Sequence, residues 1–155
     1  MTAKAEKIRL TDLAEPELTE MQKGALAHTA ANPVTLSVDA VLDAARAQTG
    51  LDDFGSDDFL PRLETWMRSA NNDAELSTVG RAGVFGESVR YATTRLYIED
   101  TIKRNPEIAE IDIDRPIVIA GLPRSGTTYL LQLMSADPRL RSLPHWEGVR
   151  PVAEP

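Results

Sequence analysis

The sequence RPIVIAGLPRSGTTYL, residues 115–130, decides the predicted fold. Residues 116–120 are apolar and mostly β-branched, which is typical of a strand covered on both faces. Residues 121–126 then contain two glycines, a proline, a serine and Arg124, and an apolar run at helical spacing follows. The pattern predicts a strand, a tight loop and the first turn of a helix. Free backbone N–H groups and the helix dipole would form an anion site there, with Arg124 supplying a full positive charge.

The loop has the spacing G-x-x-x-x-G-T-T, close to the phosphate loop G-x-x-x-x-G-K-[ST] of nucleotide hydrolases. Thr127 occupies the lysine position, and the cation of this loop is Arg124, three residues earlier. In those hydrolases the lysine contacts the β- and γ-phosphates and the next hydroxyl contacts magnesium. The exchange disfavours ATP or GTP hydrolysis and favours a loop that holds one phosphate.

This stretch resembles the phosphosulfate-binding loop of the sulfotransferases, whose pattern is P-[KR]-[ST]-G-T-[TS]. The flanking sequence is similar to a bacterial branch with a helical N-terminal region, in residues 49–55, 105–108, 115–117 and 137–147. The resemblance covers about residues 35–155, and the loop is its most specific part. The loop positions that match one by one are Pro123, Arg124, Ser125, Gly126, Thr127 and Thr128.

The resemblance implies a sulfotransferase that moves a sulfuryl group from 3′-phosphoadenosine-5′-phosphosulfate (PAPS) to a hydroxyl or amine of a small-molecule acceptor. It implies that residues 123–128 bind the donor, that Arg124 neutralises the leaving phosphate, and that no metal takes part. In that family an arginine and a serine farther along the chain grip the 3′-phosphate, and this sequence has no counterpart of them. We therefore expect the chain to be the N-terminal part of a longer enzyme, with poor or no activity alone.

The expected fold class is α/β, with a P-loop-like parallel sheet preceded by a helical N-terminal region. Only the first strand–loop–helix–strand unit of the sheet is expected, with the second strand at residues 140–143. Because a β-α-β crossover places both strand ends at one edge, the chain after that strand should lie beside the loop. The predicted divisions are a loose arm (1–34), a helical region (35–105) and the start of the sulfotransferase core (106–155).

Two residues after the second predicted strand are candidates for the base that accepts the proton of the acceptor. Glu147 comes first, because in the bacterial families that this chain resembles an acidic residue in this place is the base. His145 is the runner-up, since an imidazole titrates in a useful range. A surface carboxylate or a helix cap is the alternative interpretation of Glu147.

Four helices are expected before the loop. A weak one should cover residues 16–31, and Ser37 and Gly50 should bound the second. Asp57 or Asp58 should cap the third, whose apolar face includes Trp66 as a core residue. A long helix should run from about residue 77 to 104, with three glycines (Gly80, Gly83 and Gly86) that indicate close packing or a break. Its arginines, among them Arg90 and Arg95, should form a solvated face, the alternative being a place at the active site.

Composition excludes several classes of protein. The 155 residues are 42% hydrophobic and carry a net charge of −7, so bulk charge does not attract nucleic acid. There is no cysteine, which excludes disulfides and thiolate metal sites. The four aspartates of residues 52–58 lack the spacing of an EF-hand, and we predict no metal site. The absence of a long apolar run predicts no stable membrane insertion and a soluble, cytoplasmic protein. The oligomeric state stays open.

Two other functions fit parts of the sequence. A nucleotide or metabolite kinase also places a phosphate loop after its first strand, although Thr127 argues against it. A non-catalytic helical binding module would use residues 35–104 and leave the loop without a role.

Overall fold

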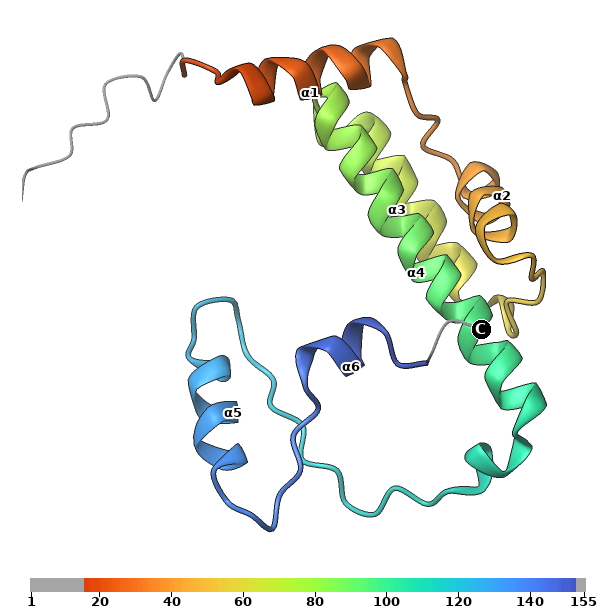
Figure 1. The fold of residues 1–155 in the computed structure, drawn as a ribbon, viewed down its shortest axis with the longest axis vertical. Coiled ribbons are helices and arrows are strands. Elements are labelled where there is room, and N and C mark those ends of the chain that lie inside the picture. Colours follow the sequence, from red (N-terminus) through yellow and green to blue (C-terminus); the bar gives the residue numbers. More distant parts are fainter. Residues whose placement is uncertain (1–15, 153–155) are drawn as a thin grey trace, which may run out of the picture.

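Helices make up the regular structure of residues 16–152, the part of the chain that the computed structural model describes (Figure 1). None of the helices in this range is long and apolar enough to cross a membrane. The first fifteen residues of the predicted arm lie outside the described range. The α-helices are α1 (Glu20–Ala31), α2 (Val38–Thr49), α3 (Leu60–Asn72), α4 (Thr78–Arg104), α5 (Thr127–Ser135) and α6 (His145–Val149), and the 3₁₀ helices are η1 (Asp57–Phe59) and η2 (Pro106–Glu110).

The caps of α2 and α4 confirm the helix boundaries that the sequence predicts. The hydroxyl of Ser37 accepts a hydrogen bond from the backbone N–H of Ala40 at 3.2 Å. Gly50 ends α2 in the left-handed conformation with φ 71°, which a glycine adopts without strain. Ser77 caps α4 in the same way, through the N–H of Gly80 at 3.2 Å. Local sequence therefore sets where these two helices begin.

The core lies along the seam between α2 and α4, the longest helix (Figure 1). Val41 and Ala45 of α2 and Leu96 of α4 are completely buried there. Burial of a side chain of this size contributes about 1.5–3 kcal/mol. α1 lies against α4 as well, and α3 adds Met67 and Ala70 to the core.

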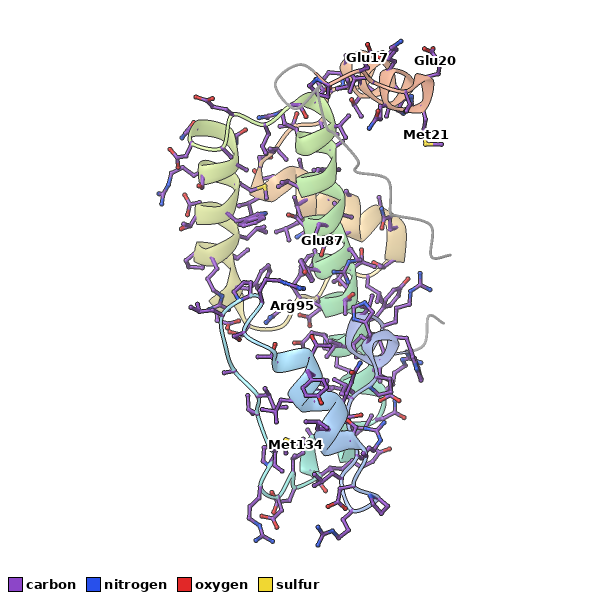
Figure 2. The ribbon with its side chains drawn as sticks, turned by 90° about the vertical axis from the view of Figure 1, so that its left-hand side faces the viewer. Glu17, Glu20, Met21, Glu87, Arg95 and Met134 are labelled. Atoms are coloured by element: carbon purple, nitrogen blue, oxygen red, sulfur yellow. The ribbon has the colours of Figure 1, made fainter. Side chains whose placement is uncertain are left out.

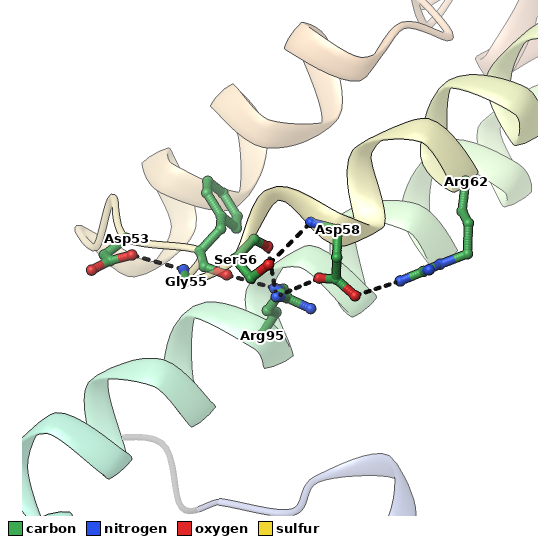
Figure 3. Close-up of polar contacts among 7 residues, drawn as sticks. Asp53, Gly55, Ser56, Asp58, Arg62 and Arg95 are labelled. Carbon is green, nitrogen blue, oxygen red and sulfur yellow. Dashed lines mark hydrogen bonds and ion pairs between the residues drawn. The ribbon is translucent and has the colours of Figure 1, made fainter.

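Arg95 fastens the connection between α2 and α3 to α4 (Figure 3). Its guanidinium donates to the carbonyl oxygens of Phe54 at 2.5 Å and Ser56 at 2.8 Å. It also reaches the carboxylate of Asp58 at 3.2 Å and lies 4.5 Å from the ring centroid of Phe59. The predicted solvated face is therefore wrong for Arg95, whose role is to hold this loop.

Two details of the helical region differ from the sequence prediction. Ser56, not an aspartate, caps the turn that leads into α3, and Trp66 is 55% exposed, not a core residue. The three glycines of α4 do not break the helix, and a Cβ at Gly83 or Gly86 would meet open space, whereas one at Gly80 would contact the side chain of Leu76.

The predicted α/β fold is wrong: residues 16–152 contain no β-strand, and the described chain is all-helical. Residues 116–120 and 140–143 are not helical and form no ladder, and Ile117 and Val118 are 61% and 81% exposed. Both segments border one hollow with Met134 of α5, labelled in Figure 2, so they lie in the same region without pairing. A strand requires backbone hydrogen bonds from a neighbour, and apolar β-branched residues alone do not supply them.

The segment between α4 and the loop does not pack its isoleucines into the core. Ile111 and Ile113 are 65% and 75% exposed. Within the described range, every residue of the buried core precedes residue 97. The loop and α5 are therefore built by local backbone geometry and not by the core.

Replacing Arg95 with alanine should lower the free energy of unfolding by about 1.5–3 kcal/mol, because two carbonyl oxygens lose a charged donor. Arg104→Ala is the control, since Arg104 forms an exposed pair with Asp100 one turn away, worth about 0.3–0.5 kcal/mol. Urea unfolding followed by circular dichroism measures both. Equal effects of the two substitutions would show that Arg95 does not hold the loop.

Candidate functional site

The loop of residues 121–126 changes backbone direction at two left-handed positions. Arg124 has φ 67° and Gly126 has φ 91°, whereas Ser125 between them has no positive φ. Alternation of this kind turns successive backbone N–H groups to one side and forms the concave nest that binds anions. A left-handed arginine costs about 1–2 kcal/mol, and such strain is concentrated at functional sites.

A tight turn closes the loop from within. The N–H of Ser125 donates to the carbonyl of Leu122 at 3.2 Å, and the Ser125 hydroxyl donates to the same carbonyl at 2.6 Å. Gly121 is needed beside this turn, because a Cβ there would lie 2.7 Å from that hydroxyl and 2.9 Å from Cγ2 of Thr127. Since the Ser125 N–H is occupied, the donors available to an anion begin at Gly126.

α5 starts at Thr127 with Gly126 as its cap. Glycine has no side chain that could accept hydrogen bonds from the first turn, and the first N–H groups of a helix have no acceptor within it. The positive end of the helix dipole lies at the same place. The backbone thus offers several donors and a partial positive charge at one point. Arg124 is exposed and adjacent, so it can add its full charge.

The structure places Glu147 and His145 on α6, not after a strand. The Glu147 carboxylate is 23% exposed and pairs with Arg141 at 2.5 Å, a partner that the sequence analysis missed. Arg141 lies in the segment before α6 and Glu147 lies on α6, and no sequence motif links the two residues. No hydrogen bond among residues 16–152 joins α6 to the loop. The described hydrogen bonds therefore do not connect the two candidate bases, Glu147 and His145, with Arg124 of the loop.

Arg90, Asp53 and Asp58 have partners outside the loop of residues 121–126. Arg90 pairs with Glu87 at 2.6 Å, and this bond, followed by one with Tyr91, lowers the pKa of Glu87 to about 2. Asp53 pairs with Lys103 and accepts from the N–H of Gly55. Asp58 pairs with Arg62 and Arg95. These contacts stabilise the helical region and account for two of the four aspartates of residues 52–58.

Comparison with known families identifies the segment that contains the loop. Residues 116–154, which contain the loop, match the sequence profile described as "Sulfotransferase family". The match begins at the segment before the loop and continues past Glu147. Comparison with curated proteins gives no match.

Two solved structures are similar to this chain over most of its length. One is sulfotransferase STF1 from Mycobacterium tuberculosis H37Rv, with 32% identity, a TM-score of 0.69, and coverage of 74% of this chain and 32% of that chain. The other is sulfotransferase STF9 from Mycobacterium avium, with 30% identity, a TM-score of 0.69, and coverage of 76% and 30%. The chain therefore spans about a third of the length of each.

Gly121→Ala should disrupt the loop, because the added methyl would overlap the Ser125 hydroxyl and the methyl of Thr127. The expected result is at least a tenfold loss of affinity for adenosine 3′,5′-bisphosphate, measured by calorimetry. Gly83→Ala, where a methyl meets open space inside α4, should instead keep the affinity and raise stability by about 0.5–1 kcal/mol. An unchanged affinity in the Gly121 variant would show that the loop geometry does not matter for this ligand.

Proposed function

We propose that this chain carries the donor-binding loop of a PAPS-dependent sulfotransferase that transfers the sulfuryl group to a small-molecule hydroxyl or amine. The observation that carries the proposal is the left-handed pair Arg124 and Gly126 at the start of α5, within a segment that matches the family. Members of this family typically use PAPS. The solved relatives are about three times as long as this chain, so the activity of a whole sulfotransferase is here a proposal.

The loop suits the 5′-phosphosulfate end of the donor. The N–H groups of Gly126, Thr127 and Thr128 would donate to oxygens of the 5′-phosphate, and the Arg124 guanidinium would face the oxygen that carries the sulfur. That oxygen gains negative charge as its bond to sulfur breaks. A cation and aligned N–H groups stabilise this charge without reorganisation, which is the usual source of catalysis in such a site. Pro123 and the Ser125–Leu122 turn keep the loop in shape.

The transfer forms a bond between the acceptor oxygen or nitrogen and sulfur, and breaks the bond between sulfur and the 5′-phosphate. The acceptor also loses a proton, which needs a base. Glu147 is the proposed base, and His145 is the runner-up. Arg141 donates a hydrogen bond to the Glu147 carboxylate at 2.5 Å and thereby fixes its direction. The proton would leave the acceptor for this carboxylate as the bond to sulfur forms.

Arg124→Ala should weaken the binding of adenosine 3′,5′-bisphosphate about ten- to a hundredfold, because a charged hydrogen bond is worth about 1.5–3 kcal/mol. Arg124→Lys should restore part of the affinity, since it keeps the charge. Arg115→Ala is a matched control from the same segment, as Arg115 is exposed and pairs with Asp114.

Calorimetry on the whole protein decides the outcome. Unchanged affinity in Arg124→Ala would remove the arginine from the donor site. Tighter binding of ATP with magnesium than of adenosine 3′,5′-bisphosphate without metal would instead favour phosphoryl transfer.

Glu147→Gln should lower the turnover of sulfuryl transfer about 10²–10⁴-fold with donor affinity nearly intact, because the amide keeps the shape of the side chain but cannot accept the proton. His145→Ala should have a much smaller effect. Transfer from PAPS to 2-naphthol, measured on the whole protein under single-turnover conditions, reports the chemical step. A dead His145 variant beside an active Glu147→Gln variant would reverse the two roles.

A further inference from the structure

An ion pair joins α6 to the segment that leads into it. Nη2 of Arg141 lies 2.5 Å from Oε2 of Glu147. The Glu147 side chain is 23% exposed, whereas the Arg141 side chain is 74% exposed. The carboxylate is therefore the sheltered member of the pair, and the guanidinium is the member that faces solvent.

α6 is a short helix that gives its side chains little support. It has five residues, none of them buried, and Pro144 before it provides no side-chain cap. Its backbone hydrogen bonds run from the N–H of Gly148 to Pro144 and from the N–H of Arg150 to Trp146, so they stay within one turn. A glutamate side chain has several rotatable bonds, and a contact to its carboxylate selects among their rotamers. The bond from Arg141 makes that selection for Glu147.

The pair uses one of the two carboxylate oxygens of Glu147. Arg141 donates to Oε2, and none of the hydrogen bonds among residues 16–152 ends on Oε1. An ionised carboxylate accepts on both oxygens. Oε1 can therefore take a proton while Oε2 keeps its contact with the guanidinium.

Arg141 has two opposing effects on a carboxylate that must take a proton. It fixes the direction of the carboxylate, which speeds a transfer that depends on distance and angle. Its positive charge also favours the ionised form and so opposes protonation. Because the guanidinium is 74% exposed, solvent screens that charge and weakens the second effect. Positioning should dominate, and the loss of Arg141 should slow the reaction.

We propose that Arg141 is a positioning residue for sulfuryl transfer, which anchors Oε2 of Glu147 so that Oε1 accepts the proton of the acceptor. As the acceptor oxygen or nitrogen forms its bond to sulfur, its proton passes to Oε1. The electron pair of the bond between sulfur and the 5′-phosphate stays on the phosphate. This role rests on the proposed function, in which Glu147 is the base, whereas the ion pair does not.

Single-turnover transfer from PAPS to 2-naphthol tests the role. Arg141→Gln should slow transfer about ten- to a hundredfold with donor affinity unchanged, because misplacing a reacting group by about 1 Å costs up to about 10²-fold. Arg141→Lys should restore part of the rate, since an ammonium can still donate to Oε2. Arg139→Gln is the matched control, because Arg139 lies in the same segment but pairs with Asp137, and it should leave the rate unchanged.

A double substitution separates positioning from general damage. In the Glu147→Gln protein, Arg141→Gln should slow transfer no further, because no base is left to orient. A general structural role would instead give the full loss in both backgrounds, and that result would overturn the proposal. Transfer at the unaltered rate in Arg141→Gln alone would overturn it as well.

The ion pair can be measured without turnover. Nitrogen NMR of the arginine side chains should show separate, slowly exchanging Nη signals for Arg141, and Glu147→Gln should merge them. Merged signals in the unaltered chain would overturn the pair and the proposal together. An active Glu147→Gln protein, or the absence of any transfer, would overturn the role of Arg141 by removing the proposed function, and separate Nη signals would then show that the pair itself stands.

Discussion

Burial along the seam between α2 and α4 is the constraint on which the rest of the structure depends. Val41, Ala45 and Leu96 are shielded completely from solvent there, and the side chains that surround them come from α2, α3, α4 and the connection after α2. α4 is long enough to contact α1 near its start and to lead into η2 at its end. The 27-residue helix α4 thus contacts or leads into the elements from α1 to η2, and these elements pack against different parts of it.

The faces of α4 contact different parts of the structure. One face carries Val89 and Leu96 into the core, while a neighbouring face carries Tyr91 and Ile98 to a groove between α3 and α4. Arg95 lies between these two faces and donates hydrogen bonds to backbone carbonyls of the α2–α3 connection. These bonds position η1 and the start of α3, and therefore the far wall of the groove. The loop of residues 121–126 is formed differently, by the left-handed residues Arg124 and Gly126, the second of which caps α5.

Short-range sequence patterns predicted α2, α4 and the loop. Features that depend on residues far apart in the sequence were predicted wrongly. Ser37, Gly50 and Ser77 bound their helices as the sequence indicated, because a cap is a contact within four residues. The strands expected at residues 116–120 and 140–143 do not form in the described chain, since a strand depends on a partner that hydrophobic pattern alone does not name. The same limit applies to Trp66, whose helical spacing predicted an apolar face but not what covers that face.

The sequence by itself determined the boundaries of α2 and α4, the loop with Arg124 between two glycines, and the resemblance to the sulfotransferase family. These features depend on short-range backbone preferences and on a motif read in order along the chain. Only the tertiary structure decided that Arg95 holds a loop, that Arg141 pairs with Glu147, and that Trp66 and Tyr91 border one groove. Each of these joins residues from different helices or connecting segments, so their contact depends on how the chain packs and turns in space.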